Sequence, residues 1–329
     1  VVDRAQRGII YDRNGVKLVE NVQKFRVSIS RTENKEEDLK KTITNLSKIF
    51  GQDVTKNYEE ELERIKDLKN INEVKIFSGL DYNPYIFQLE ANPNDFPLLE
   101  TEKYSQRKYL YPELTSHIIG YTGDIDAEDY STGKYNYGDE IGKFGLEKTF
   151  DSILRGQNGL VRIDNYSAEK KSVSSNTQYK MNGKDLYLTL DLNYQRKLYE
   201  LTETAMKRKD FNTSNSIAAV AEDINSGDIL AMVSYPTFNS NDFVGGISAV
   251  KYNEYLNNPG KPLSNKTTQY SQSPGSTFKL LTDMVALDEG AITKCTRYST
   301  GSFELCGVTF YDAARKNWGE IDMNKALCV

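Results

Sequence analysis

The chain has 329 residues, of which 38% are hydrophobic and 27% are charged, a balance typical of a folded globular protein with a core. Lysine and arginine total 42 against 47 aspartates and glutamates, so the net charge of -5 gives no electrostatic basis for binding nucleic acid. There is no run of about eighteen apolar residues to span a membrane, and a single histidine argues against a histidine-based triad. The length favours two domains, or three.

The chain begins with a predicted hairpin. Residues 7–11 predict a strand, and the Asn14-Gly15 pair is a strong signal for the tight turn of a hairpin. The chain would return over residues 16–19, and residues 23–31 predict a further strand.

Two helices are predicted next. Residues 33–68 carry apolar side chains at helical spacing, and Gly51 divides them into two amphipathic segments. We expect residues 35–100 to form a small inserted α/β subdomain, with most of its residues in contact with solvent.

His117 stands alone on an apolar segment, and a histidine without partner residues is expected to be structural rather than catalytic. Residues 142–156 predict a turn entering a short helix that ends at Gly156. Their glycines do not follow a strand in a phosphate-binding arrangement, which argues against a nucleotide site. Residues 165–182 are polar and predict a linker or a long hairpin.

A domain boundary is expected near Lys184. Beyond it, residues 186–191 predict a strand and residues 194–207 a helix. The apolar runs 217–224 and 229–234 flank a turn and predict a hairpin of two well-buried strands. Helix, hairpin, polar loop and helix follow one another in an α+β order, which is the predicted fold class.

The most informative stretch is a serine and a lysine three residues apart. The Pro274-Gly275 pair predicts a turn into an amphipathic helix that ends at Gly290. Ser276 and Lys279 would lie on one helix face, where an amine can take the proton of a hydroxyl nucleophile. The lysine can do so only if it is partly desolvated, and we expect Phe278 and the leucines behind it to bury this helix.

The spacing alone is weak, because a chain of this length should contain roughly two or three such pairs by chance. None of the other pairs opens an apolar helix behind a Pro-Gly turn, so we interpret them as solvated positions. These pairs are Ser105/Lys108, Ser131/Lys134, Ser167/Lys170 and Ser248/Lys251.

An ordered set of motifs resembles the class B penicillin-binding proteins, the monofunctional transpeptidases that cross-link peptidoglycan. The first three resemble the amino-terminal motifs of that family, the fourth resembles the strands that start its penicillin-binding domain, and the fifth resembles its active-site motif. They are residues 7–15, residues 107–120, residues 142–156, residues 217–239 and residues 274–279.

The resemblance implies an elongated, non-catalytic pedestal or dimerisation-type module over residues 1–184, with residues 35–100 as its head subdomain. Residues 185–329 would form the first part of a transpeptidase domain similar to the serine β-lactamase fold. The family also needs Ser-x-Asn and Lys-Thr-Gly motifs, which are expected beyond Val329, so these 329 residues are expected to be catalytically incomplete. Residues 301–329 look more like the elongation branch than the division branch.

The resemblance also implies a mechanism. Ser276 would attack the D-Ala-D-Ala carbonyl of a stem peptide, with Lys279 as its base, and β-lactams would acylate the same serine. No cofactor would be required. The partners would be peptidoglycan stem peptides and membrane-bound cell-wall synthesis proteins such as a glycosyltransferase, with no nucleic acid. The protein would lie on the extracytoplasmic face of the bacterial cell membrane, anchored by a helix upstream of Val1.

Other classes of protein share this fold. A β-lactam sensor lacks the amino-terminal module, so residues 1–184 argue against it. A non-catalytic scaffold that binds the cell wall is the other alternative. A serine β-lactamase is a compact single domain. The first 180 or so residues of this chain would have no counterpart in it, which argues against that class.

The three cysteines, Cys295, Cys306 and Cys328, all lie near the end of the chain. They could bind a structural zinc ion, because some elongation-type members of the family that the chain resembles carry a metal site here, with Glu304, Asp312 or a cysteine beyond Val329 as a fourth ligand. A disulfide between two of them is the rival, and three buried small residues are the third alternative.

Overall fold

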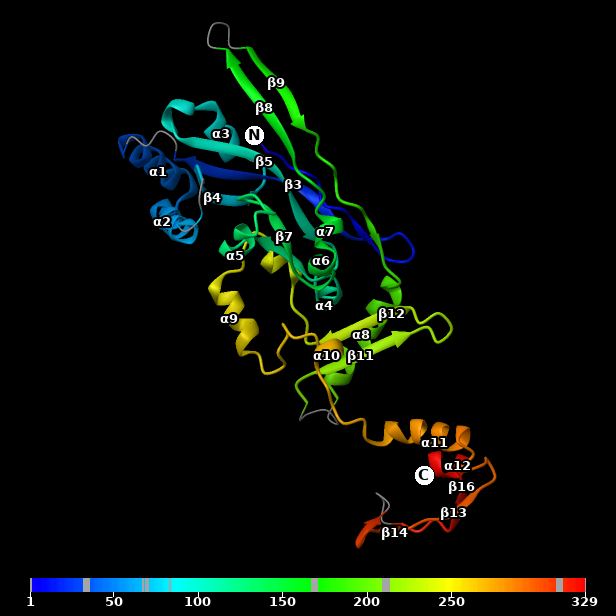
Figure 1. Cartoon of the computed structure of the whole chain (residues 1–329). Helices are drawn as coiled ribbons and strands as arrows, with labels where there is room; N and C mark the ends of the chain where they lie inside the picture. The colour runs from blue at the N-terminus through cyan, green and yellow to red at the C-terminus, as the bar shows by residue number, and fades with distance from the viewer. Residues whose placement is uncertain are drawn as a thin grey trace. The chain divides into compact units, whose positions relative to one another are not determined.

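The computed structural model describes residues 2–31, 36–66, 68, 71–82, 84–166, 171–208, 214–311 and 316–328. The chain forms two compact units, Val1–Gln269 and Tyr270–Val329, which are described separately below. Helices and strands are mixed along the chain, as the sequence predicts (Figure 1). Within the described residues, no helix is both long enough and apolar enough to cross a membrane.

The first unit is built on a five-stranded sheet in which β3 (Lys17–Ser30) holds the central place. Three strands pair with it directly in antiparallel fashion: β2 (Ile10–Tyr11), β4 (Glu73–Leu80) and β5 (Leu99–Tyr109). The strand β10 (Leu186–Tyr187) adds to β2 in parallel. Residues on both sides of the expected boundary at Lys184 therefore share one sheet.

The strand β3 is continuous, and the prediction of separate strands over residues 16–19 and 23–31 is wrong. No glycine or proline interrupts Lys17–Ser30, and β5 pairs with this strand from Val19 opposite Tyr109 to Ile29 opposite Leu99. The predicted turn before it is confirmed: Gly15 has a φ of 79° and its N–H donates to the carbonyl of Asp12 at 3.1 Å.

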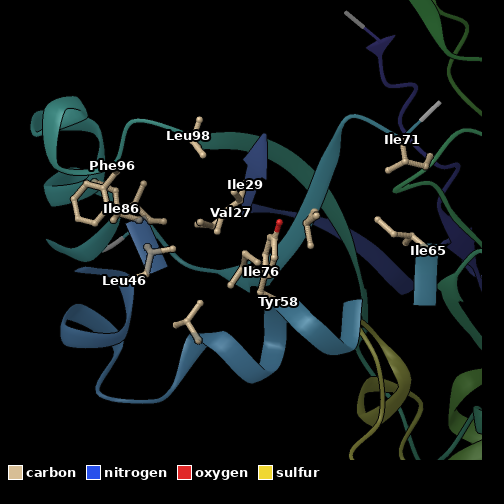
Figure 2. Close-up of a cluster of buried hydrophobic side chains, with 13 residues drawn as sticks. Val27, Ile29, Leu46, Tyr58, Ile65, Ile71, Ile76, Ile86, Phe96 and Leu98 are labelled. Atoms are coloured by element: carbon tan, nitrogen blue, oxygen red, sulfur yellow. The ribbon is translucent and has the colours of Figure 1, made fainter. Parts of the chain in front are cut away.

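The inserted subdomain contains α1 (Glu36–Phe50), α2 (Val54–Ile65), α3 (Pro84–Ala91) and the short η1 (Pro93–Asp95). Most of its described residues are exposed or half-buried, as expected, and its apolar side chains close a hydrophobic core against the sheet. Side chains of α1 and α2, such as Leu46 and Tyr58, face those of β3 in Figure 2. The core consists of Val27, Ile29, Leu46, Val54, Tyr58, Ile65, Ile71, Val74, Ile76, Ile86, Leu89, Phe96 and Leu98.

Short elements follow the sheet: α4 (Ser116–Ile119), β6 (Tyr121–Asp124), α5 (Ala127–Ser131), β7 (Glu140–Phe144), α6 (Gly145–Thr149) and α7 (Asp151–Leu154). The strands β6 and β7 form an antiparallel pair. Gly156 has a φ of 74°, so the helical stretch ends there as predicted.

The polar stretch around residue 170 is a long hairpin, which was one of the two predicted alternatives. Its strands are β8 (Gly159–Tyr166) and β9 (Lys171–Gln178), which run side by side in Figure 1. The short β1 (Val2–Asp3) pairs with β8 and extends this sheet to three strands.

The rest of the first unit carries α8 (Leu192–Met206), β11 (Ile217–Glu222), β12 (Ile229–Tyr235), η3 (Ser240–Phe243), α9 (Ala249–Asn257) and α10 (Lys266–Gln269). The predicted hairpin is confirmed, but only β12 has fully buried residues. The side chains of β11 alternate between half-buried and exposed, because among the described strands β11 pairs with β12 alone. The helix α8 starts earlier than predicted, since Asp191 caps it by accepting hydrogen bonds from the amides of Asn193 and Tyr194.

The second unit contains one longer helix, two antiparallel strand pairs and a short terminal helix. Its elements are η4 (Gly275–Thr277), α11 (Phe278–Asp288), β13 (Arg297–Ser299), β14 (Ser302–Leu305), β15 (Val308–Tyr311), β16 (Glu320–Asp322) and α12 (Met323–Cys328). The strand β13 pairs with β16, and β14 pairs with β15.

Candidate active site

The candidate nucleophile lies in a tight turn at the start of α11. Pro274 has a φ of -65° and Gly275 a φ of 58°, a left-handed value that glycine adopts without strain. The hydroxyl of Thr277 donates to the carbonyl of Pro274 at 2.6 Å and closes the turn. The helix ends at Asp288, and Gly290 follows with a φ of 67°. The predicted turn, helix and stop are therefore confirmed.

Ser276 and Lys279 both lie on this helical segment and both are exposed. Their spacing of three residues across η4 and α11 places them on one face. In the described part of the chain no hydrogen bond joins the two side chains, and no group accepts from the amide of Ser276. Such unpaired amides at a helix start attract negative charge, which suits an oxyanion.

The expected burial of α11 is wrong. Phe278, Leu280, Leu281, Met284 and Val285 are between 49% and 66% exposed. The described elements of the second unit leave the apolar residues of α11 uncovered. These side chains therefore leave Lys279 solvated here, so its action as a base would depend on desolvation by a bound substrate.

Three of the other serine–lysine pairs lie on secondary-structure elements, and none of them resembles the pair at Ser276 and Lys279. Ser105 and Lys108 lie three residues apart on β5, so their side chains point to opposite faces of the strand. Ser248 caps α9, accepting from the amide of Lys251 at 3.3 Å. The hydroxyl of Ser131 donates to a carbonyl within its own helix. The pair at positions 167 and 170 lies outside the described residues.

The three cysteines are free and exposed, so their interpretation as buried small residues is wrong. Cys295 follows α11, Cys306 lies in the turn between β14 and β15 with a φ of 52°, and Cys328 ends α12. Among the residues that the structure describes, no three histidine, cysteine, aspartate or glutamate side chains gather around a common point. The residues present therefore do not fit a zinc site in this arrangement, although Asp312 lies outside the described residues.

A buried glutamate joins the three amino-terminal motifs, and sequence reasoning missed it. Glu147 is fully buried and its two carboxylate oxygens accept from two arginines, Arg7 Nε at 2.6 Å and Arg107 Nε at 2.7 Å. Asp151 adds a second carboxylate, which accepts from Arg7 Nη1 at 2.7 Å and from the amide of Gly142 at 2.9 Å. The available signal was that each of the three motifs carries charged residues of a sign that could pair with those of another.

A tyrosine completes this charged centre. The hydroxyl of Tyr109 donates to Glu147 at 3.4 Å and accepts from the amide of Thr122 at 2.8 Å. Burial, and secondarily the charge of Glu147, raise the pKa of Tyr109 well above its usual range, so it stays protonated. The centre therefore couples β5, β6 and α6 through one network of hydrogen bonds.

His117 is structural, as predicted. Its side chain is buried, its Nε2 donates to the carbonyl of Pro262 at 2.6 Å, and its ring packs edge-on against Phe238 with centroids 5.2 Å apart. Burial lowers the pKa of His117 to about 4, partly offset by the Pro262 carbonyl. A neutral imidazole with a committed N–H serves here to hold the loop around residue 262.

An aromatic cluster ties residues beyond 237 to the amino-terminal module. Tyr121 stacks on Phe243 with ring centroids 3.9 Å apart, and Phe238 meets the edge of Tyr121 at 5.9 Å. Phe144 and Tyr255 pack on the same Phe238 at 6.0 and 6.3 Å. Residues from β6, β7 and the segment after β12 thus share one packed cluster.

Comparison with known families agrees with this architecture. The family model described as the penicillin-binding protein dimerisation domain matches residues 2–188, and that of the penicillin-binding protein transpeptidase domain matches residues 217–328. The chain therefore belongs to the penicillin-binding protein family, as its motifs predicted, with a dimerisation domain followed by residues of the transpeptidase domain.

Among the similar proteins of known name are peptidoglycan D,D-transpeptidases. The peptidoglycan D,D-transpeptidase MrdA of Haemophilus influenzae is 31% identical over 98% of this chain and 49% of its own length. The protein of the same name from Escherichia coli K12 is 30% identical over 97% of this chain and 49% of its own length. The chain thus spans about half the length of these curated relatives.

Solved structures show the same fold. The complex of penicillin-binding protein PBP2 with MreC from Helicobacter pylori matches with a TM-score of 0.84 and 25% identity, covering 99% of this chain and 60% of that one. The PBP2 structure determined without MreC matches with a TM-score of 0.76 at 24% identity, covering 99% and 61%.

Proposed function

We propose that this chain is part of a peptidoglycan D,D-transpeptidase in which Ser276 is the acylated nucleophile and Lys279 its base. The observation that carries the proposal is the Pro274-Gly275 turn, which presents both residues on one face at the start of α11. The relatives named as D,D-transpeptidases and the transpeptidase family match over residues 217–328 support it. They favour this function over a sensor or a wall-binding scaffold.

The proposed reaction forms and breaks one ester. Ser276 Oγ adds to the carbonyl of the penultimate D-alanine while its proton passes to Lys279, and the amide of Ser276 stabilises the oxyanion. The intermediate collapses to an acyl-serine, and the terminal D-alanine leaves with a proton on its amine. The amino group of a second stem peptide then attacks the ester carbonyl, and one of its protons passes through Lys279 to the oxygen of Ser276 as that oxygen leaves. A β-lactam would acylate the same oxygen and stay bound.

Labelling with a fluorescent penicillin tests the assignment in the full-length protein that contains this chain. Ser276→Ala should abolish labelling, since no other oxygen occupies its place. Lys279→Ala should slow acylation by roughly a hundredfold or more, the usual worth of a positioned proton acceptor. Ser273→Ala, an exposed serine of the same loop, is the matched control and should label normally. Labelling of the Ser276→Ala protein at another serine would refute the assignment.

We also propose that residues 1–184 form the non-catalytic module that contacts membrane-bound cell-wall proteins on the extracytoplasmic side. The matched PBP2 structure is a complex with MreC, which supports a partner-binding role for this fold. A glycosyltransferase is a further candidate partner. Cross-linking of the full-length protein in membranes, followed by purification, should recover such a protein with it. Recovery of the protein alone would contradict the proposal.

The zinc hypothesis needs the thiols of Cys295, Cys306 and Cys328 to meet, which they do not do in the described arrangement. Metal analysis of protein purified without a histidine tag tests it. One zinc per chain, lost with thermal stability on chelation, would support the hypothesis, and a mass two hydrogens below the reduced value would indicate a disulfide instead.

A further inference from the structure

The inserted subdomain is fastened to the segment between β6 and β7 by polar contacts. The hydroxyl of Tyr137 donates to Glu61 of α2, and Arg64 of the same helix donates through Nη1 to the carbonyl of Ile125 at 3.1 Å. Arg64 also forms two hydrogen bonds with Glu61, at 2.6 and 2.7 Å, so one carboxylate organises both contacts. Burial, and then the hydrogen bond to Glu61, raise the pKa of Tyr137 well above its usual range, so this hydroxyl stays a donor. These contacts hold α2 on residues 125–137.

A lysine of β4 fastens the same segment a second time. The amide of Lys75 donates to the hydroxyl of Tyr137 at 3.3 Å, and its ammonium group pairs with Asp124 at the end of β6. Burial by itself would raise the pKa of Asp124, but the charge and hydrogen bond of Lys75, with the charge of Arg64, lower it, so Asp124 is ionised. The ion pair is largely buried, with 12% of the Lys75 side chain and 23% of the Asp124 side chain exposed. Lys75 is therefore the cation on which this attachment depends.

A second carboxyl group lies directly across the strand pair from Asp124. Glu140 of β7 is its partner in the antiparallel register of β6 and β7, so the two side chains lie on the same face. Like charges in opposite positions destabilise a strand pair. In the described part of the chain, no hydrogen bond or ion pair engages the carboxyl group of Glu140. The register therefore places two carboxyl groups beside one another, and only one of them has a cation.

Charged and titratable groups face Glu140 from all the surrounding elements. Those that act on it most directly are Asp124 of β6, Lys75 of β4, Arg26 of β3, Tyr104 of β5 and Arg7 of the amino-terminal segment. The cavity of about 440 Å³ that Glu140 lines adds Asp3, Arg4, Glu102, Lys103, Arg107, Asp139, Arg155 and Lys180. Among these described residues, every cation except the exposed Lys103 already contacts another carboxylate. Glu140 therefore has no buried cation of its own.

The protonation state of Glu140 changes near neutral pH. Burial, with the charge of Asp124 second, raises the pKa of Glu140 to about 7, and the charges of Arg26 and Lys75 offset only part of this rise. The carboxyl group is therefore neutral in mildly acidic solution and ionised in mildly basic solution. When it ionises, Asp124 and Glu140 compete for the ammonium group of Lys75.

We propose that Glu140 works as a proton-operated latch on the inserted subdomain. With Glu140 neutral, Lys75 stays with Asp124, and α2 and β4 stay fastened to residues 124–140. With Glu140 ionised, the two opposed carboxylates repel each other and weaken the hold of Asp124 on Lys75, and the contacts of α2 open with it. The latch lies within the first unit and is independent of the proposed transpeptidase reaction.

Hydrogen exchange of the 329-residue chain at pH 5 and pH 8 tests the latch, with rates expressed as protection factors to remove the pH dependence of intrinsic exchange. In the native chain, protection of residues 54–65 and 124–140 should fall roughly fiftyfold or more between these pH values, because Glu140 loses its proton more readily once the latch is open. Glu140→Gln cannot ionise, so its protection there should be the same at both. The matched control is Glu128→Gln, which changes an exposed glutamate of α5 and should leave the native behaviour intact.

A second variant tests whether the contacts open together. Tyr137→Phe removes the hydroxyl that donates to Glu61 and should lower the protection of residues 54–65 about tenfold or more at pH 5, the usual effect of losing a hydrogen bond to a charged group. A pH dependence that persists in the folded Glu140→Gln variant would overturn the assignment of Glu140. Protection of residues 54–65 equal to that of α8 at pH 8 would show that the subdomain opens only when the whole unit unfolds, and would overturn the latch.

Discussion

The buried centre around Glu147 offers the sharpest test of how the amino-terminal module is held together. The change is Glu147→Gln, which keeps the volume of the side chain and removes its charge. In the native chain the carboxylate lies between Arg7 and Arg107, at 2.6 and 2.7 Å, and all three side chains are at most 10% exposed. Arg107 would then lose the one carboxylate that it contacts among the described residues, while Arg7 would keep Asp151.

The expected loss in the free energy of unfolding follows from the burial of this ion pair. Removing one partner of a buried ion pair typically costs about 3–5 kcal/mol, because the remaining charge stays away from water. Whole domains are stable by only about 5–15 kcal/mol, so this change should take away roughly a fifth or more of the free energy of unfolding. A loss of about 4 kcal/mol corresponds to a roughly thousandfold increase in local opening.

Hydrogen exchange is the appropriate assay. The single tryptophan, Trp318, belongs to the second unit, so tryptophan fluorescence would not report on this centre. Peptides covering residues 7–11 and 142–151 should exchange roughly a thousandfold faster in Glu147→Gln. The control is Glu20→Ala, which removes a partly exposed ion pair with Lys108 at 3.0 Å and should cost less than about 1 kcal/mol. If both variants exchange alike, the buried centre does not stabilise the module.

Two further predictions concern titration and thiol chemistry. Because folding raises the pKa of Glu140 from its usual 4.5 to about 7, the free energy of unfolding should fall as pH rises from about 4.5 to 7 and then level off. Measured by thermal unfolding at pH 8, the Glu140→Gln variant should be more stable than the native chain by up to about 3 kcal/mol. At pH 4 the two proteins should have similar stability. A variant that is less stable than the native chain at pH 8 would contradict the raised pKa. The exposed Cys295, Cys306 and Cys328 should all react with a maleimide in the native state, giving three adducts by mass, and fewer would contradict their exposure.

Much of the site and of the local structure could be predicted from the sequence, because the signals are short-range. The Pro274-Gly275 turn, the helix behind it and its end at Gly290 depend on the backbone preferences of proline and glycine, which act over a few residues. The turn at Asn14-Gly15 has the same basis. The family followed from the order of several such motifs along the chain.

Interactions between distant residues could not be predicted in this way. Arg7 and Glu147 are 140 positions apart, and only the folded chain brings them within 2.6 Å. The uninterrupted β3 depends on pairing with β5, and the core of the inserted subdomain depends on helices closing over that same strand.

The exposure of α11 is a second case in which a local sequence pattern does not specify tertiary contacts. Its amphipathic pattern predicts a buried face, but burial requires another surface to pack against it, and a pattern within one helix does not specify that surface. The sequence alone therefore determined the turns, most of the helices and strands, the family, and the position of Ser276 and Lys279 on one helix face. The tertiary structure decided which charges meet and which faces are covered, because both depend on contacts between segments far apart in the chain.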